Sequence, residues 1–271
     1  MRMGEGLPCP VCGAAAAYQA IAPGGSLRET RCPACRSARR TRDLARYLLR
    51  AYGDGRAADL PAALPALDGL RVYEAQASGP LHLVLQALPG YLCSEYLPEA
   101  ARPGEIRADG VRCEDLQALS FPDGSLDLVI TQDVLEHVAD PWRALAEIFR
   151  VLAPGGRHVF TVPIHPGHPT TRRAEPRGAE VRHLLPPVHH GDPLRRGGSL
   201  VFTDFGDDLP ARLCAMGQPT EVASRAGLHG PGEVPWIAEG DPYLRYQRAR
   251  AEGRKASFLL YDSVVLVTQR P

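Results

Sequence analysis

The chain has 271 residues, enough for one large α/β domain and a small appendage. Its hydrophobic fraction of 44% predicts a globular protein with a sizeable core. The 31 basic and 31 acidic residues balance, which argues against bulk nucleic acid or an anionic membrane as partner. No apolar run approaches the roughly 18 residues that span a bilayer, and the first residues lack a signal-peptide pattern. We therefore expect a cytoplasmic protein with no membrane partner and with reduced thiols.

Four of the seven cysteines form two CxxC pairs near the N-terminus. Cys9 and Cys12 make the first pair, and Cys32 and Cys35 make the second after nineteen intervening residues. Each pair can present two thiolates on a tight turn, and this spacing is typical of a zinc ribbon. Because four thiolates fill a tetrahedral zinc ion, the sequence predicts a structural rather than a catalytic metal.

An arginine-rich segment, residues 36–46, follows the second cysteine pair. Leu44, Tyr47 and Leu48 fall on one face of a predicted helix, and the arginines take the other face. This helix could grip RNA beside the ribbon, or its arginines could form the solvated face of a linker helix. We favour the solvated face, because the rest of the chain is balanced in charge. The ribbon module and linker helix are assigned to residues 1–52.

From residue 53 onward the chain is interpreted as one domain, in which strand-like and helix-like segments alternate. This alternation predicts an α/β fold with a mostly parallel sheet. Strands are expected at residues 70–75, 91–95, 111–113, 126–131 and 158–163, and helices at 81–88, from Asp140 to the Pro154-Gly155-Gly156 stretch, and at 204–216. We expect seven strands in all, with the last one, at 258–267, antiparallel.

Several motifs follow one another in a characteristic order. They are Asp115-Leu116, the stretch 119–129, Asp133-Val-Leu-Glu-His-Val138 and Arg150-Val-Leu-Ala-Pro-Gly-Gly156. Together they resemble the signature of class I S-adenosylmethionine-dependent methyltransferases of the type 11 kind, over about residues 70–163. The cysteine pairs before the domain resemble those of bacterial members that carry a four-cysteine ribbon. The resemblance implies a Rossmann-like fold, S-adenosylmethionine as cofactor and methyl transfer as activity.

The same resemblance assigns cofactor contacts to residues at strand ends, where ligands bind in open α/β sheets. Glu95 ends the second strand and would accept hydrogen bonds from the ribose hydroxyls. Asp115, with the backbone of Leu116, would read the adenine edge. Gln132 and Asp133 would line the methionine moiety and the methyl acceptor.

The loop after the first strand departs from the family pattern. The stretch Glu74-Ala-Gln-Ala-Ser-Gly79-Pro80 keeps one glycine of the usual three. We still assign Glu74, Gln76 and Gly79 to the cofactor site. Either the loop takes another conformation, or cofactor binding is weakened or lost. We favour the first alternative, because the neighbouring alanines and serine are small.

The segment 164–200 is rich in proline and histidine and is predicted to be a lid over the acceptor site. His189 and His190 in this segment are candidates to accept a proton from the acceptor. His137, beside the predicted cofactor site, is a third candidate, with a purely orienting role as the alternative. A metal site formed by His165, His168 and His189 is a disfavoured alternative, because the spacing matches no standard pattern.

Three functions are compatible with these patterns. The favoured one is methyl transfer to a small molecule such as a sugar or a secondary metabolite. The second is methylation of RNA or protein, with the ribbon as the docking module. The third is a non-catalytic binding protein on the same fold, which the altered glycine loop would explain.

Overall fold

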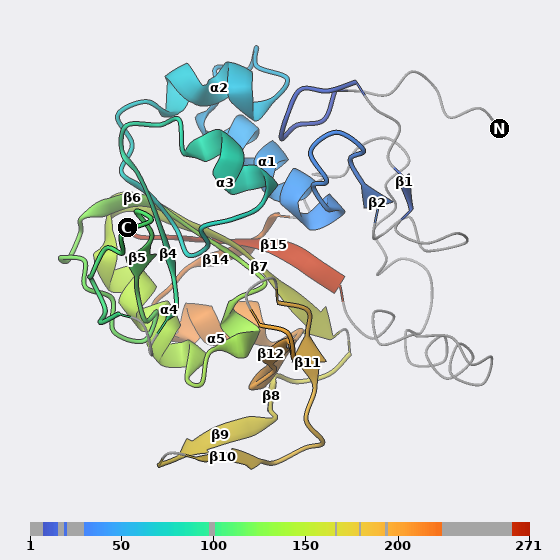
Figure 1. Cartoon of the computed structure of the whole chain (residues 1–271), viewed down its shortest axis with the longest axis vertical. Helices are drawn as coiled ribbons and strands as arrows, with labels where there is room; N and C mark the ends of the chain where they lie inside the picture. The colour runs from blue at the N-terminus through green and yellow to red at the C-terminus, as the bar shows by residue number, and fades with distance from the viewer. Residues whose placement is uncertain are drawn as a thin grey trace.

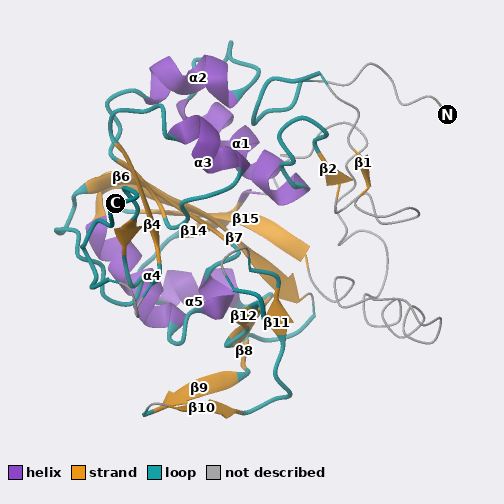
Figure 2. Ribbon diagram, viewed as in Figure 1, coloured by secondary structure: helices purple, strands orange, loops and turns teal. Residues whose placement is uncertain are grey.

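A central β-sheet separates two layers of helices in the computed structural model (Figures 1 and 2). Helices α1 (Arg39–Tyr52), α2 (Leu60–Leu67) and α3 (Pro80–Leu85) cover one face, and α4 (Pro141–Val151) and α5 (Leu209–Ala215) cover the other. The structure describes residues 8–15, 19–20, 30–97, 101–165, 167–178, 180–192, 195–223 and 262–271. Within these ranges, no helix has the length and apolar character needed to cross a membrane.

The main sheet has the strand order β14-β15-β7-β6-β3-β4-β5. Its strands are β3 (Val72–Glu74), β4 (Tyr91–Glu95), β5 (Arg112–Cys113), β6 (Leu126–Gln132), β7 (Leu152–His165), β14 (Thr220–Val222) and β15 (Asp262–Gln269). The first five in chain order are parallel to one another, and β15 runs antiparallel to both of its neighbours. This arrangement confirms the predicted Rossmann-like sheet. Strand β13 (Thr203–Gly206) adds to it by pairing with β7 and with β8 (Thr171–Arg172).

The central strands are buried on both faces, as parallel strands between helix layers must be. Leu128, Val129 and Ile130 of β6 are completely buried. Ile130 packs into the core beneath α1 to α3, and Val129 packs into the core above α4 and α5. The alternation of these side chains between the two cores fixes the register of β6, since a slip of one residue would exchange them.

Several predicted boundaries were wrong. The fifth parallel strand begins at Leu152, so the Pro154-Gly155-Gly156 stretch lies inside β7 rather than at the end of a helix. Helix α4 does begin as predicted, because the Asp140 carboxylate accepts a hydrogen bond of 3.1 Å from the backbone N–H of Arg143. The helix expected at 204–216 is divided into β13 and α5. Met216, the last residue of the expected helix, follows α5 and is 41% exposed.

The described part of the last strand is Asp262–Gln269, which extends two residues past the predicted end at residue 267. Residues 258–261 of the expected strand lie outside the described residues. The segment 164–200 contains short strands in place of the irregular chain that its composition suggested. They are β8, β9 (Ala174–Arg177), β10 (Glu180–His183), β11 (His189–His190) and β12 (Ser199–Leu200). Strands β9 and β10 form one antiparallel pair, and β11 and β12 form another.

The N-terminal module packs directly on the main sheet. Its short strands β1 (Gln19–Ala20) and β2 (Thr30–Arg31) pair antiparallel, as expected for a ribbon. One apolar cluster contains Cys9 of the ribbon, Leu48 of α1 and Val159 of β7. The ribbon and α1 therefore share a core with the sheet, and the division between residues 52 and 53 stays a prediction.

The solvated arginine face predicted for α1 was wrong. Arg39 is 3% exposed and Arg42 is completely buried. Arg42 donates to the carbonyl oxygens of Ser37 and Thr30, at 2.7 and 3.2 Å. Arg39 donates to the buried carboxylate of Asp43 at 2.8 Å. Because α1 lies between the cysteine loops and the sheet, its polar face is covered by the ribbon and the guanidinium groups bind there.

We predict that Asp43→Ala lowers the free energy of unfolding by about 3–5 kcal/mol, because it removes the carboxylate from a buried ion pair. Urea unfolding of the full chain measures this change. Arg182→Ala is the matched control, since its ion pair with Glu175 is largely exposed, and it should change stability by less than about 0.5 kcal/mol. Equal effects of the two substitutions would contradict the structural role of Asp43.

Candidate functional site

The carboxyl ends of β3 and β6 meet at one edge of the sheet and bring two predicted cofactor residues together. The Gln132 side-chain amide donates to Glu74 Oε1 at 3.0 Å, and the Tyr91 hydroxyl donates to Glu74 Oε2 at 2.7 Å. Glu74 is completely buried, and this burial raises the pKa of its carboxyl to about 8. With both oxygens engaged, Glu74 holds the strand ends in place beneath the site.

The altered glycine loop closes on itself. The Gln76 side-chain amide donates to the carbonyl oxygen of Ser78 at 2.7 Å. Gly79 has a φ of 93°, and a Cβ atom there would lie 2.9 Å from Gln76 Nε2. The backbone conformation therefore favours glycine at this position, whereas the flexible Gln76 side chain could move aside. Glycines carry no side chain at these positions in the family pattern, whereas here the Gln76 side chain bonds to the backbone of the loop.

Glu95 ends β4 next to this loop, and its carboxylate is partly engaged. Its Oε1 accepts a hydrogen bond of 2.9 Å from the backbone N–H of Ala77. Its Oε2 accepts none from any residue that the structure describes. Burial raises the pKa of Glu95, although the side chain keeps some solvent exposure. A half-buried carboxylate with one available oxygen can accept hydrogen bonds from a diol.

Asp115 and Leu116 lie after β5, on the neighbouring part of the same edge. Asp115 Oδ1 accepts hydrogen bonds from the backbone and side-chain N–H groups of Gln117, at 2.9 and 3.1 Å. The backbone N–H of Leu116 makes no hydrogen bond within the described chain. A free backbone donor beside a fixed carboxylate is a suitable partner for the edge of an adenine ring.

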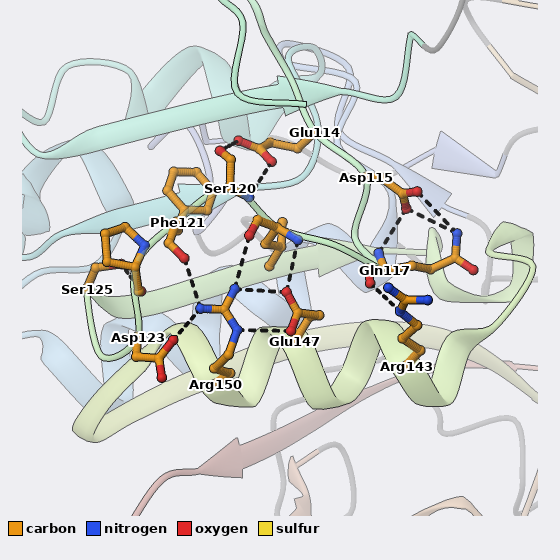
Figure 3. A network of polar contacts seen from close by, with 12 residues as sticks. Glu114, Asp115, Gln117, Ser120, Phe121, Asp123, Ser125, Arg143, Glu147 and Arg150 are labelled. Carbon is orange, nitrogen blue, oxygen red and sulfur yellow. Dashed lines mark hydrogen bonds and ion pairs between the residues drawn. The ribbon is translucent and has the colours of Figure 1, made fainter. Parts of the chain in front are cut away.

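Helix α4 holds the loop that carries Asp115, as Figure 3 shows. Arg150 donates to the backbone carbonyls of Leu119 and Phe121, each at 3.0 Å, and to the Asp123 carboxylate at 2.5 Å. Glu147 accepts from the backbone N–H of Leu119 at 3.0 Å. Sequence reasoning used Arg150 as part of a motif but missed this anchoring role, because it depends on contacts between separate segments.

Asp133, just after β6, connects the site to the N-terminal helix. Its backbone takes a φ of 49°, a left-handed conformation that is uncommon for a residue other than glycine. Thr161 donates to its Oδ1 at 2.8 Å, and Arg40 of α1 pairs with its Oδ2 at 2.6 Å. Arg40 was treated as a surface residue in the sequence. The ion pair places it instead at the candidate site.

Two of the three histidines proposed for catalysis lie together. The rings of His137 and His190 meet edge to face, with their centroids 5.1 Å apart. Both imidazoles approach the buried carboxylate of Glu136, at 3.7 and 3.6 Å. His189, the preceding residue in β11, is exposed. Burial raises the pKa of Glu136 to about 8 and lowers that of His190.

The described residues contain two groups of three or more metal-ligating side chains whose ligand atoms lie within 4.8 Å of one another. One group is the four cysteines Cys9, Cys12, Cys32 and Cys35, and the other is Glu136, His137 and His190. The set of His165, His168 and His189, which the sequence spacing already disfavours, is not among them. In the cysteine group, Sγ atoms of separate pairs lie 3.9 Å apart.

The lid segment reaches the end of β4. Arg195 donates to the backbone carbonyl of Tyr96 at 3.2 Å, next to Glu95, and pairs with Asp192 at 2.8 Å. The lid also contacts the segment that follows β6, because His137 Nδ1 lies 2.8 Å from the carbonyl oxygen of Leu200 at the end of β12. The predicted lid therefore spans the edge at which the cofactor residues end.

Comparison with known proteins identifies part of this domain. Residues 91–160 match the family model of the methyltransferase domain. An uncharacterised methyltransferase of Mycobacterium sp. strain KMS is 37% identical over 107 residues, which are 38% of this chain and 40% of that protein. One of Mycobacterium avium strain 104 is 32% identical over 151 residues, which are 46% of this chain and 58% of that protein. The chain thus spans about half the length of these curated relatives.

Among solved structures, an S-adenosylmethionine-dependent methyltransferase from Mesorhizobium loti aligns with a TM-score of 0.42 and 19% identity, over 77% of this chain and 96% of that one. The family match and the curated relatives confirm the resemblance carried by the sequence motifs. The chain therefore contains a segment, residues 91–160, that matches a methyltransferase domain.

The buried Glu74 should make stability depend on pH. Its pKa is higher in the folded state than in the unfolded chain, so the folded state binds the extra proton between about pH 4.5 and pH 8. Stability contributed by this group is therefore lost as the pH rises through that window. Glu74→Gln should remove about 2–4 kcal/mol of this loss between pH 5 and pH 8, measured by urea unfolding. Glu105→Gln, which changes an exposed carboxylate, is the control and should keep the wild-type dependence of stability on pH. If Glu74→Gln also keeps that dependence, the interpretation is wrong.

Proposed function

We propose that the protein transfers a methyl group from S-adenosylmethionine to a small-molecule acceptor. The observation that carries this proposal is the pair of available groups at the sheet edge, Glu95 Oε2 and the Leu116 N–H. They lie at the two positions that the family motif assigns to ribose and adenine. The residues present therefore fit the nucleoside, in spite of the altered glycine loop.

When bound, S-adenosylmethionine supplies an electrophilic methyl group on its sulfonium. The chain's own contribution is to bind, to orient and to exclude water. Glu95, Asp115 and Leu116 would hold the nucleoside, and the loop around Gly79 would lie against it. Gln132 and Asp133, at the end of β6, would line the methionine moiety. Arg195 and the lid strands would limit the access of water from the side of Glu95.

The burial and pairing of the arginines on α1 favour a small-molecule acceptor over RNA. An RNA-binding helix must present its guanidinium groups to phosphates. Here Arg39 and Arg42 are buried, and Arg40 is paired with Asp133 inside the site. The lid over the edge also supports an enclosed acceptor pocket of the kind that small ligands occupy. Methylation of RNA or protein remains the alternative, with the ribbon as docking module.

His137 and His190 are proposed to lie beside the acceptor, because they belong to segments that border the predicted methyl-transfer site. An unprotonated imidazole in that place can take a proton from an acceptor hydroxyl or amine. His189 was proposed for the same role from the sequence. Its exposure makes it the weaker candidate of the adjacent pair.

Calorimetric titration with S-adenosylmethionine tests the proposal. We expect saturable binding by the full chain, weakened about 10- to 100-fold by Glu95→Ala and by Asp115→Ala, because each change removes a hydrogen bond to a charged group. Asp109→Ala, at an exposed carboxylate on a nearby loop, is the matched control and should bind as the wild type does. Absence of binding by the folded wild-type chain would contradict the proposal and favour a non-catalytic protein on this fold.

We propose further that the four clustered cysteines hold a structural zinc ion. Tetrahedral coordination at about 2.3 Å from zinc to sulfur separates neighbouring sulfurs by about 3.8 Å. The 3.9 Å between Sγ atoms of Cys9 and Cys35, and of Cys12 and Cys32, fits this geometry. Four ligands from the chain leave no open position, so this ion would stabilise the ribbon against the sheet.

Replacement of the zinc by cobalt provides a test, since thiolate ligands give cobalt a characteristic charge-transfer absorption. Cys12→Ser should abolish that absorption and lower the free energy of unfolding by several kcal/mol, because metal binding is coupled to folding. Cys214→Ser, at an exposed cysteine outside the cluster, should leave both unchanged. A wild-type chain without thiolate-bound cobalt would contradict the ribbon site.

A further inference from the structure

The carboxylate of Glu136 is buried without a hydrogen-bonding partner. The residue is 1% exposed, and neither Oε1 nor Oε2 accepts a hydrogen bond from any described residue. An ionised carboxylate in such a place is costly unless a cation or a proton compensates its charge. The imidazoles of His137 and His190 lie 3.7 and 3.6 Å from its Oε1. These three residues are called the Glu136 cluster below.

The hydrogen bonding of His137 determines which of its nitrogens faces Glu136. Its Nδ1 lies 2.8 Å from the carbonyl oxygen of Leu200. Because a carbonyl oxygen accepts but does not donate, Nδ1 carries the proton in this contact. In the neutral imidazole, Nε2 then presents a lone pair 3.7 Å from Glu136 Oε1. His137 Nε2 and Glu136 Oε1 thus point lone pairs at each other. Because two lone pairs repel, a cation or a proton between them would stabilise this arrangement.

The geometry is close to that of a metal site. His190 Nδ1 lies 3.6 Å from the same Glu136 oxygen, and the three ligand atoms all lie within 4.8 Å of one another. Zinc with nitrogen and oxygen ligands at about 2.0–2.2 Å separates the ligand atoms by roughly 3.3–3.6 Å. A small inward movement of the imidazoles would therefore complete the coordination.

The surroundings of the cluster also match those of a ligand set. A metal-binding histidine commonly donates its other ring N–H to a backbone carbonyl, as His137 does to Leu200. Glu136 and His137 lie on the short 3-10 helix η2 (Leu135–His137), and His190 comes from the lid strand β11. Arg40 and Asp133, which border the cluster, form an ion pair with each other.

We propose that Glu136, His137 and His190 form a second metal site, for a divalent transition metal such as zinc or cobalt. Magnesium and calcium are disfavoured, because they prefer oxygen ligands throughout. Three ligands from the chain leave a coordination position for water or another small ligand, in contrast to the closed cysteine site. The metal would join the lid to the end of β6. A metal-bound imidazole cannot also take a proton, so occupancy would replace the acid–base role proposed for these histidines.

Titration of the full chain with cobalt, after the cysteine site has been loaded with zinc, tests this inference. Calorimetry and visible absorption should show one further cobalt per chain, with no thiolate charge-transfer band. His190→Ala should weaken this binding at least about 100-fold, because loss of a ligand exceeds the 10- to 100-fold effect of outer contacts. His189→Ala, at the exposed neighbour in the same strand, is the matched control and should retain it.

Glu136→Gln provides a second variant, which keeps the side-chain shape while it removes the ligand charge, and it should also lose the second cobalt. Circular dichroism and urea unfolding establish that each variant is folded. The inference is overturned if the zinc-loaded wild type binds no further cobalt, which would mean that a proton alone compensates Glu136. It is equally overturned if the folded His190→Ala variant binds cobalt as tightly as the His189→Ala control.

Discussion

The position of β3 between β4 and β6 is the constraint on which the rest of the site depends. Parallel pairing of these three strands brings their carboxyl ends to one edge, so that Glu74, Glu95 and Gln132 lie on adjacent strand ends. The hydrogen bond from Gln132 to the buried Glu74 links the end of β6 to the end of β3. Any cofactor that binds there meets groups whose positions are set by the backbone pairing of the sheet, rather than by flexible side chains.

The N-terminal module is coupled to that edge through α1. The helix shares an apolar core with the sheet, and its buried arginines bind the ribbon on the opposite side. Arg40, at the start of the same helix, pairs with Asp133 at the end of β6. The strained backbone of Asp133 is thus held by Thr161 from one side and by Arg40 from the other. In this arrangement the four-cysteine cluster supports the position of a residue in the site as well as the N-terminal fold.

The sequence was sufficient for features that depend on local pattern. The strand at residues 126–131 and the helix start at Asp140 follow from a local apolar run and from short-range hydrogen bonding, and both were predicted. The burial of Arg42 was missed, because helical periodicity shows one apolar face but not a second face covered by the ribbon. The approach of His190 to Glu136 was missed for a similar reason, since it depends on the path of the lid. The order of the motifs predicted the roles of Glu95 and Asp115. The structure added the hydrogen-bonding partners of their side chains.

We propose that this sheet edge binds the adenosyl group through Glu95, Asp115 and Leu116. A crystal structure of the full chain grown with S-adenosylhomocysteine would show whether it does. We expect the ribose hydroxyls on Glu95 and the adenine ring beside Asp115 and the Leu116 N–H. A nucleoside bound elsewhere, or an edge without nucleoside at saturating ligand, would refute this assignment.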